Sequence, residues 1–525
     1  MRRLLVGMKL GYLKTVRVCL SLVFFGLTAL VFLDLASVIP PAFIGGILYL
    51  QFVPSLLAFS HGAALGAAGW LFVAALTALF GRVYCSTVCP LGTLQDAIGF
   101  SAGKRRRFHF RPAGTLRYVI AAITVLLLIG GSNLLLNLLD PFSAFGRVLA
   151  DLVRPAVIMG NNIAAAGFEQ FGHYAVSRKQ WAVLTPLAVG VAATTLVMVG
   201  WLAARRGRLY CNTVCPVGTL LGLVSRFSWL GIGIDHDRCT KCGRCERVCK
   251  AGCIDFTRMR VDTGRCVACY NCLAACRAGA VHFENRWRRA SAVQADQGRR
   301  NFFLHSGVSL LGLAGLVETN ATVLQSKPTT IPEAVTGPVS PPGSVSIERF
   351  TSLCTACHLC VSVCPSRVLS PSILEFGPSG MMQPRLNFRA SYCNYECTLC
   401  TQVCPTGAIL PLAPELKKRT QLGVARFIKE NCIVFTDNTN CGACSEHCPT
   451  KAVRMVPYPN PLNRVLVIPE VQPDYCVGCG ACEHACPTKP FKAICVDGNP
   501  VHVKSKKPEI KALEIKIDDT GDFPF

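Results

Sequence analysis

The chain has 525 residues, of which 51% are hydrophobic and 16% are charged, and its formal net charge is +24. A mean hydropathy of +0.40 is typical of a protein with membrane-embedded segments, and the length implies more than one domain. The excess of Lys and Arg would suit a nucleic-acid partner, but these residues flank apolar segments, as they do in membrane proteins. We therefore expect a membrane protein that does not bind nucleic acid.

Four apolar segments lie in the first 204 residues, each close to the roughly 20 residues that cross a hydrocarbon core. They are Val18–Ile39, Gly62–Phe80, Tyr118–Leu139 and Trp181–Ala204. Basic clusters precede the first, separate the second from the third and follow the fourth, so that four spans place all of them on the cytoplasmic side. Pro40–Phe59 is also apolar, but its three prolines predict an interfacial or re-entrant segment on the outer side.

The string Gly81–Leu94 (GRVYCSTVCPLGTL) recurs as Gly207–Leu220 (GRLYCNTVCPVGTL), each copy after an even-numbered span. We expect two helical hairpins related by a pseudo-twofold axis along the membrane normal. A helical C-x-x-x-C places both thiols on one face, and the symmetry would then gather four ligands for one further metal centre. Redox-active thiols or simple packing residues are the alternatives. The four cysteines are Cys85, Cys89, Cys211 and Cys215.

Six more groups of four cysteines have the C-x-x-C-x-x-C-x-x-x-C layout of a [4Fe–4S] motif, or a variant of it with a longer first gap. Zinc ribbons use two separated pairs instead, and the concentration of 24 of the 31 cysteines in one layout argues against a disulfide scaffold. We expect six clusters. The groups are Cys239, Cys242, Cys245 and Cys249; Cys266, Cys269, Cys272 and Cys276; Cys354, Cys357, Cys360 and Cys364; Cys393, Cys397, Cys400 and Cys404; Cys432, Cys441, Cys444 and Cys448; and Cys476, Cys479, Cys482 and Cys486.

The first two groups lie within Ile234–Phe283, a length typical of a two-cluster ferredoxin. The fourth cysteine of each motif in such proteins ligates the neighbouring cluster. We therefore expect Cys276 to complete the first group and Cys249 the second. The pairing among the four later groups stays open.

Other redox cofactors are not expected. The string from Cys354 to His358 matches the haem-attachment pattern C-x-x-C-H, but a haem there would remove two ligands from a cluster. The apolar segments also lack the paired histidines that a haem between the two membrane faces needs. No nicotinamide or flavin fingerprint is present.

Arg299-Arg300-Asn301-Phe302-Phe303-Leu304 matches the twin-arginine export string, and a juxtamembrane basic patch is the alternative. Either one directs the following residues outward. The expected parts are a four-helix membrane domain (1–233), a cytoplasmic two-cluster ferredoxin domain (234–285), a basic segment with an apolar anchor (286–325), a proline-rich linker (326–344) and a periplasmic four-cluster domain (345–525). The fold class is an α-helical membrane domain with α+β ferredoxin-like domains.

These motifs carry two family resemblances. Met1–Phe283 resembles NapH, the membrane quinol-oxidising subunit of periplasmic nitrate reductase systems, through its spans, its two C-x-x-x-C-P strings and its two-cluster tail. Gln297–Phe525 resembles NapG and MauM through Arg299-Arg300, Pro341-Pro342-Gly343 and its four cysteine groups. One departure is that Lys250 and Arg277, rather than proline, follow the first two groups.

The resemblances imply a protein of the bacterial inner membrane that passes electrons from the quinone pool through [4Fe–4S] clusters to a periplasmic reductase or c-type cytochrome. Two alternatives remain. One is a maturation factor that supplies electrons for the assembly of a partner's metal site, and the other is a conduit fed by a cytoplasmic ferredoxin.

Overall fold

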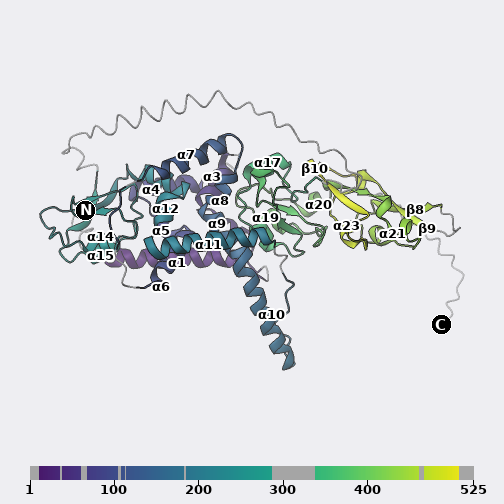
Figure 1. Cartoon of the computed structure of the whole chain (residues 1–525), viewed down its shortest axis with the longest axis horizontal. Helices are drawn as coiled ribbons and strands as arrows, with labels where there is room; N and C mark the ends of the chain where they lie inside the picture. Colours follow the sequence, from purple (N-terminus) through teal and green to yellow (C-terminus); the bar gives the residue numbers. More distant parts are fainter. Residues whose placement is uncertain are drawn as a thin grey trace.

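The computed structural model describes residues 11–35, 38–60, 68–103, 108–112, 114–181, 185–286, 337–459 and 466–507. Three parts follow one another along its long axis (Figure 1). We call them the two-group unit (230–286), the helical domain (11–229) and the four-group unit (337–507). The expected export string at Arg299-Arg300, the apolar anchor and most of the linker lie outside the described residues.

Two helices of the helical domain are long and apolar enough to cross a membrane, α1 (Gly11–Leu33) and α11 (Pro186–Arg206). The apolar helices α4 (Gly69–Phe80) and α7 (Leu116–Ile129) are shorter. The expected span Tyr118–Leu139 is interrupted after Ile129, because the chain turns at a Gly-Gly pair whose second residue has a φ of 78°. The described residues thus contain two helices of spanning length, or three if one bent pair is counted as a span.

That bent pair is α2 (Pro41–Leu48) and α3 (Phe52–Ser60), whose axes differ by 103°. The bend bears out the expectation that the prolines prevent an unbroken span, because Pro41 begins one helix and Pro54 lies in the first turn of the next, where proline is tolerated.

Each C-x-x-x-C-P string forms a short helix, a break and a second helix that begins at the proline. A further run of helices connects α7 to α11. These elements are α5 (Tyr84–Thr87), α6 (Pro90–Ser101), α8 (Leu134–Leu139), α9 (Pro141–Arg147), the π-helix η2 (Val148–Val153), α10 (Arg154–Gln170), α12 (Leu209–Thr213) and α13 (Pro216–Ser225).

The two cysteine-rich units consist of short helices, loops and two-stranded antiparallel sheets. The helices of the two-group unit are α14 (Arg244–Arg247) and α15 (Asn271–Ala275), and its strand pairs are β1 (Leu230–Ile234) with β4 (Val281–Asn285) and β2 (Ile254–Asp255) with β3 (Arg260–Val261). In the four-group unit the helices are α17 (Ile347–Leu353), α18 (Leu359–Val363), η4 (Pro378–Gly380), α19 (Leu399–Gln402), α20 (Pro414–Lys417), η5 (Lys429–Asn431), α21 (Ile433–Thr436), α22 (Ala443–Glu446), η6 (Pro473–Tyr475) and α23 (Ala481–Ala485). Its strand pairs are β5 (Leu369–Pro371) with β6 (Pro384–Leu386), β7 (Thr420–Phe427) with β10 (Ile494–Lys504) and β8 (Val453–Tyr458) with β9 (Leu466–Val471).

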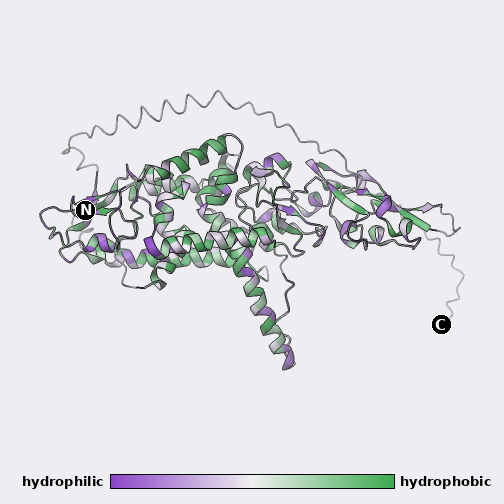
Figure 2. Ribbon diagram, viewed as in Figure 1, coloured by the Kyte–Doolittle hydropathy of each residue, from purple (hydrophilic) through white to green (hydrophobic). Residues whose placement is uncertain are grey.

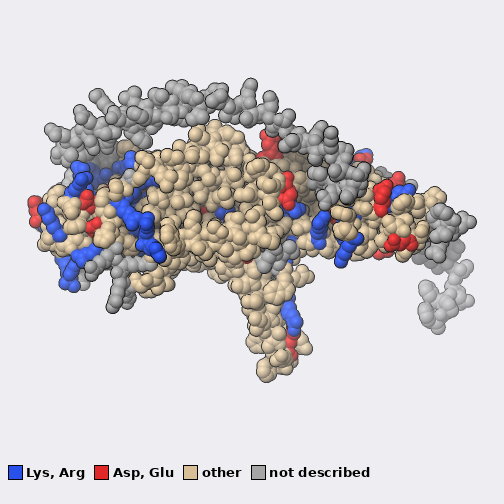
Figure 3. Space-filling model, in the orientation of Figure 1, with Lys and Arg blue, Asp and Glu red and all other residues tan. Residues whose placement is uncertain are grey.

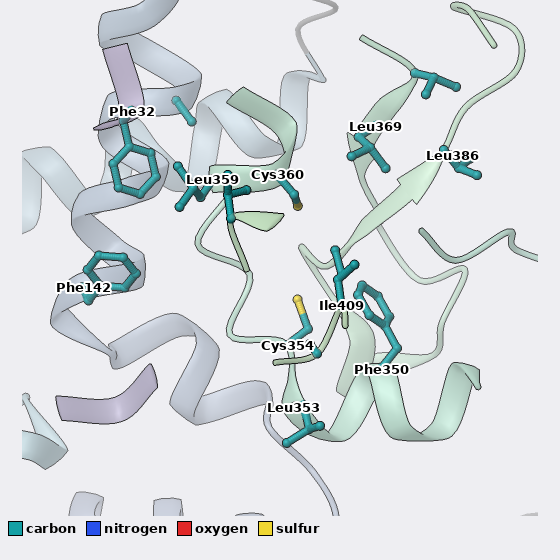
Figure 4. Close-up of a cluster of buried hydrophobic side chains, with 14 of the residues drawn as sticks. Phe32, Phe142, Phe350, Leu353, Cys354, Leu359, Cys360, Leu369, Leu386 and Ile409 are labelled. Carbon is teal, nitrogen blue, oxygen red and sulfur yellow. The ribbon is translucent and has the colours of Figure 1, made fainter. Parts of the chain in front are cut away.

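One hydrophobic core continues from the helical domain into the four-group unit. In Figure 4, Phe32 and Phe142 of the helical domain lie to the left of Leu359 of the four-group unit, and Leu359 lies beside Cys360. The helices in the middle of the molecule are the most hydrophobic part (Figure 2). Lys and Arg gather at the end that carries the two-group unit, whereas the middle shows few charges (Figure 3).

Candidate iron–sulfur centres

The structure gathers the cysteines of the four-group unit into four sets, and each set takes its fourth thiol from the neighbouring group. Two of the sets line enclosed cavities, and the members of the other two interact electrostatically with one another. Set 1 is Cys354, Cys357, Cys360 and Cys404; set 2 is Cys364, Cys393, Cys397 and Cys400; set 3 is Cys432, Cys441, Cys444 and Cys486; and set 4 is Cys448, Cys476, Cys479 and Cys482.

The two-group unit shows one half of this exchange. Cys249 joins Cys266, Cys269 and Cys272 in set 5, as the crossed rule predicts. Cys239, Cys242 and Cys245 lie together in set 6. Cys276 packs against the hydrophobic core of the two-group unit. Cys253, which the motif spacing does not single out, is buried with its Sγ 3.4 Å from Cys249 Sγ.

The backbone of the compact motifs is shaped to surround a central group. In four of the motifs the residues before and after the second cysteine have positive φ, for example Ala356 at 50° and His358 at 62°. Such conformations are costly for residues other than glycine and occur where the chain clamps a ligand. The N–H of Ala356 donates to Cys354 Sγ and that of Leu359 to Cys357 Sγ, as is usual around cluster sulfurs.

Burial disfavours the ionised form of these thiols, so they would need a bound metal to become thiolates. Burial raises the pKa of Cys357 and of Cys479 to about 12. Thiolates are the ligands of iron–sulfur clusters, and metal binding supplies the energy that deprotonates a buried thiol. In the described ranges no three His, Cys, Asp or Glu side chains close on a single metal ion. Sets of four thiols, of which sets 2 and 3 line cavities, provide the four ligands of a cube of four irons.

Contacts between sets fix their order in the four-group unit. Sets 1 and 2 exchange Cys404 and Cys364, and sets 3 and 4 exchange Cys448 and Cys486. Sets 2 and 4 also touch, because the N–H of Cys393 donates to the carbonyl of Cys479 at 2.9 Å. The order is therefore 1, 2, 4, 3, which differs from the order of the motifs along the chain.

Set 1 lies against the helical domain. Arg147 of α9 donates to the carbonyl of Ala356 at 3.2 Å, and a Cβ at Gly146 would stand 2.5 Å from the carbonyl oxygen of Cys357. Buried His358 bonds Asp151 through Nδ1 at 2.9 Å and the Met382 carbonyl through Nε2 at 2.8 Å. Both ring nitrogens are thus engaged by protein.

The repeat set (Cys85, Cys89, Cys211 and Cys215) is buried inside the helical domain, and all four residues are free cysteines. Arg82 reaches both strings, with Nη2 3.7 Å from Cys85 Sγ and 3.0 Å from the carbonyl oxygen of Cys211. The structure thus brings together the four cysteines that the internal repeat singles out.

A cavity of about 150 Å³ lies between the bend of α2 and α3 and the four-group unit. Gly45, Tyr49 and Ser55 line one side, and Gln402 and Cys404 line the other. Cys404 belongs to set 1, so this cavity joins the most apolar part of the molecule to the first cysteine set.

Family models agree with these positions. A 4Fe–4S dicluster domain matches residues 353–408 and 439–489, and a 4Fe–4S binding domain matches residues 232–255. A second 4Fe–4S binding domain matches residues 63–107 and 186–234, each of which contains one C-x-x-x-C-P string. No solved structure matches the chain.

Curated relatives point to the same class. The putative electron transport protein YccM of Escherichia coli is 25% identical over 33% of this chain and 43% of its own length. The methylamine utilization ferredoxin-type protein MauN of Methylobacillus flagellatus is 25% identical over 34% of this chain and 53% of its own length. The ferredoxin-type protein MauM of the same organism is 30% identical over 37% of this chain and 81% of its own length. The chain is thus an iron–sulfur electron-transfer protein that belongs to the MauM family of ferredoxin-type proteins.

Proposed function

We propose that the protein oxidises membrane quinol and passes the electrons through its clusters to a periplasmic reductase or c-type cytochrome. The observation that carries this proposal is the unbroken order of the sets, which begins at the apolar helices with set 1 and ends with set 3. Set 3 lies near α21 and β8, at the end of the molecule farthest from the two-group unit (Figure 1). An acceptor protein would dock there.

The cavity beside Cys404 is the candidate quinol site. A cavity of about 150 Å³ is large enough for a single aromatic ring. Its apolar wall comes from helices that would lie in lipid, and Tyr49, Ser55 and Gln402 supply polar groups for the ring oxygens. The quinol would give up its two electrons one at a time to the cluster that Cys404 helps to hold. Its two protons would go to solvent, which leaves the quinone.

The distribution of charge supports the orientation. Lys and Arg gather around the two-group unit (Figure 3), and the positive-inside rule places such an end in the cytoplasm. The four-group unit at the opposite end would then be periplasmic in the bacterial inner membrane. The resemblance of the first 283 residues to NapH supports quinol as the electron donor.

Two adjacent glycines of α2 offer a matched test. A Cβ at Gly45 or at Gly46 would meet no atom within 4 Å, but only Gly45 lines the cavity. We expect Gly45→Leu to slow the reduction of the four-group clusters by a quinol analogue about tenfold or more, equivalent to about 1.4 kcal/mol, because the new side chain enters the ring site. Gly46→Leu should keep the wild-type rate, as measured by anaerobic stopped flow.

Dithionite reduction of each variant serves as the control for cluster content and should match the wild type. Equal quinol rates in the two variants would remove the cavity from the proposal. Reduction of the wild-type protein by a ferredoxin but by no quinol analogue would contradict quinol oxidation itself.

A further inference from the structure

Two arginines join the C-x-x-x-C-P strings by reaching across from one to the other. Arg82 of the first string donates to the Cys211 carbonyl at 3.0 Å, and Arg208 of the second donates to the Cys85 carbonyl at 2.6 Å. The glycines that follow each string's proline make room for this exchange. A Cβ at Gly92 would lie 2.5 Å from Arg208 Nη1, and one at Gly218 would lie 2.8 Å from Arg82 Nη2. Both strings therefore shape the same buried site.

The thiols of the repeat set converge on this site. The thiol of Cys215 interacts electrostatically with the other three, and that of Cys89 with Cys85 and Cys211. Cys89 and Cys215 are the N-caps of α6 and α13, whose N-termini carry partial positive charge. The amide of Gln95 lies 3.3 Å from Cys211 Sγ, and the N–H of Gly218 lies 3.3 Å from Cys215 Sγ. Hydrogen-bond donors therefore reach the sulfurs of Cys85, Cys211 and Cys215.

The buried positive charge of Arg82 indicates that the site contains anionic groups. Its side chain is 0% exposed, and the structure records no ion pair between it and a carboxylate of the described residues. Its charge partners include Cys85, Cys211 and Cys215 of the repeat set, and Cys266 of set 5. A buried guanidinium without a counter-charge is strongly destabilising. If the cysteines of the repeat set were neutral packing residues, Arg82 would lose three of these counter-charges.

We propose that Cys85, Cys89, Cys211 and Cys215 hold a seventh iron–sulfur cluster of the [4Fe–4S] type, with Arg82 and Arg208 balancing the charge of its four thiolates. Four cysteine thiolates are the usual ligand set of such a cluster. This inference rests on the repeat and its buried arginines, and it does not depend on quinol as the donor.

On one side the repeat set adjoins set 5. Arg82 donates to the Gly264 carbonyl at 3.3 Å, two residues before Cys266, and interacts electrostatically with Cys266 itself. Asn212 donates to the carbonyl of Ala251 at 3.2 Å, two residues after Cys249.

On the other side the repeat set leads to set 1. Tyr210, next to Cys211, donates to the Leu139 carbonyl at 3.1 Å. Arg147 donates to the neighbouring Leu138 carbonyl at 3.1 Å and to the Ala356 carbonyl at 3.2 Å, one residue before Cys357. A cluster here links the two-group unit to the four-group unit across a helical domain that would otherwise separate them by hydrocarbon about 30 Å thick. The proposed cluster would relay one electron at a time. In each step one cluster would be oxidised and its neighbour would be reduced by the same electron.

Counting the clusters in the full-length protein tests the inference. We expect anaerobically purified wild-type protein to contain about 28 iron and 28 sulfide, at four of each per cluster. Cys85→Ala with Cys211→Ala should contain about 24 of each, and Mössbauer spectra should lose about one-seventh of the iron signal. Cys19→Ala is the matched control, because Cys19 is an exposed cysteine of α1, and it should keep the wild-type content.

Equal iron and sulfide in the wild type and the double variant would overturn the inference. The loss of one zinc or one iron without sulfide would also do so, since it would indicate a single ion. If the double variant does not accumulate, the native mass of the wild-type protein decides between seven clusters and six. Failure of quinol to reduce the protein would leave this count unchanged, so the two proposals can fail separately.

Discussion

The carboxylate of Asp96 binds cations from three distant parts of the chain. Arg17 of α1 pairs with it, Arg208 approaches to 2.9 Å and Lys250 to 3.2 Å. Burial acts to raise the pKa of Asp96, but Arg208, Lys250 and Arg17 outweigh it and hold the pKa well below its ordinary value. Since Lys250 directly follows Cys249 of set 5, this carboxylate fastens the two-group unit to the helical domain.

We expect Asp96→Asn to lower the free energy of unfolding by about 3–5 kcal/mol, because the buried Arg17 and Arg208 both lose the carboxylate that pairs with them. Glu169→Gln is the control, since Glu169 pairs with the exposed Arg178 and such pairs contribute at most about 1 kcal/mol. Thermal unfolding in detergent at pH 7 measures both. A loss no larger than that of the control would contradict the role of Asp96.

At the scale of elements, α9 and the loop of Cys357 form the junction between the helical domain and the four-group unit. Gly146 has no room for a side chain, because its Cβ would lie 2.5 Å from the Cys357 carbonyl oxygen and 2.8 Å from the ring of Phe32. Asn133 holds the end of α17 by donating to the Thr351 carbonyl at 3.2 Å and to that of Ser352. The close approach places set 1 directly on the apolar helices.

Gly146→Ala should loosen this junction by about 1–3 kcal/mol, the usual penalty for overpacking a well-packed contact. We expect faster hydrogen–deuterium exchange in residues 351–360 of the variant. Gly160→Ala in α10 is the matched control, because a Cβ there meets no atom within 4 Å and alanine favours a helix by about 1 kcal/mol. Unchanged exchange at residues 351–360 in Gly146→Ala would show that the contact is not tight.

For the whole molecule, the decisive feature is that set 4 stands between set 2 and set 3. Crossed ligands pair the sets, and the contact between Cys393 and Cys479 joins the two pairs. Phe388, five residues before Cys393 of set 2, packs on Gly480, next to Cys479 of set 4. A Cβ at Gly480 would lie 1.9 Å from the Phe388 ring, so the two pairs of sets are in close contact here. If the proposed function holds, electrons that enter at set 1 would therefore reach set 3 last.

Cys479→Ala, which removes a ligand of set 4, should leave sets 1 and 2 reducible and cut off set 3. Cys441→Ala, which damages set 3 at the free end, should leave the other three sets reducible and is the matched comparison. Freeze-quench EPR of both variants after mixing with a quinol analogue measures this. Fast reduction of set 3 in Cys479→Ala would show that electrons follow the order of the motifs in the chain.

Much of the candidate site could be predicted from the sequence because cluster ligation is local. The C-x-x-C-x-x-C spacing indicated the cysteine groups, and the crossed rule placed Cys249 with Cys266, Cys269 and Cys272. The repeated strings indicated that Cys85 and Cys211 would meet. The helices were predicted less well. The prolines correctly indicated that Pro40–Phe59 is not one unbroken helix, but the expected span Tyr118–Leu139 missed the break at Gly130-Gly131, because hydropathy does not show where an apolar segment turns.

The sequence by itself determined the chemistry of this protein, because the type and spacing of the cysteines decide which cofactor the chain can bind. Only the tertiary structure decided the order of the cysteine sets in space, because that order depends on contacts between residues far apart in the chain, such as Arg147 with Ala356 and Cys393 with Cys479. The same holds for Arg82, whose need for an anionic partner becomes visible only when folding buries it between the two repeats.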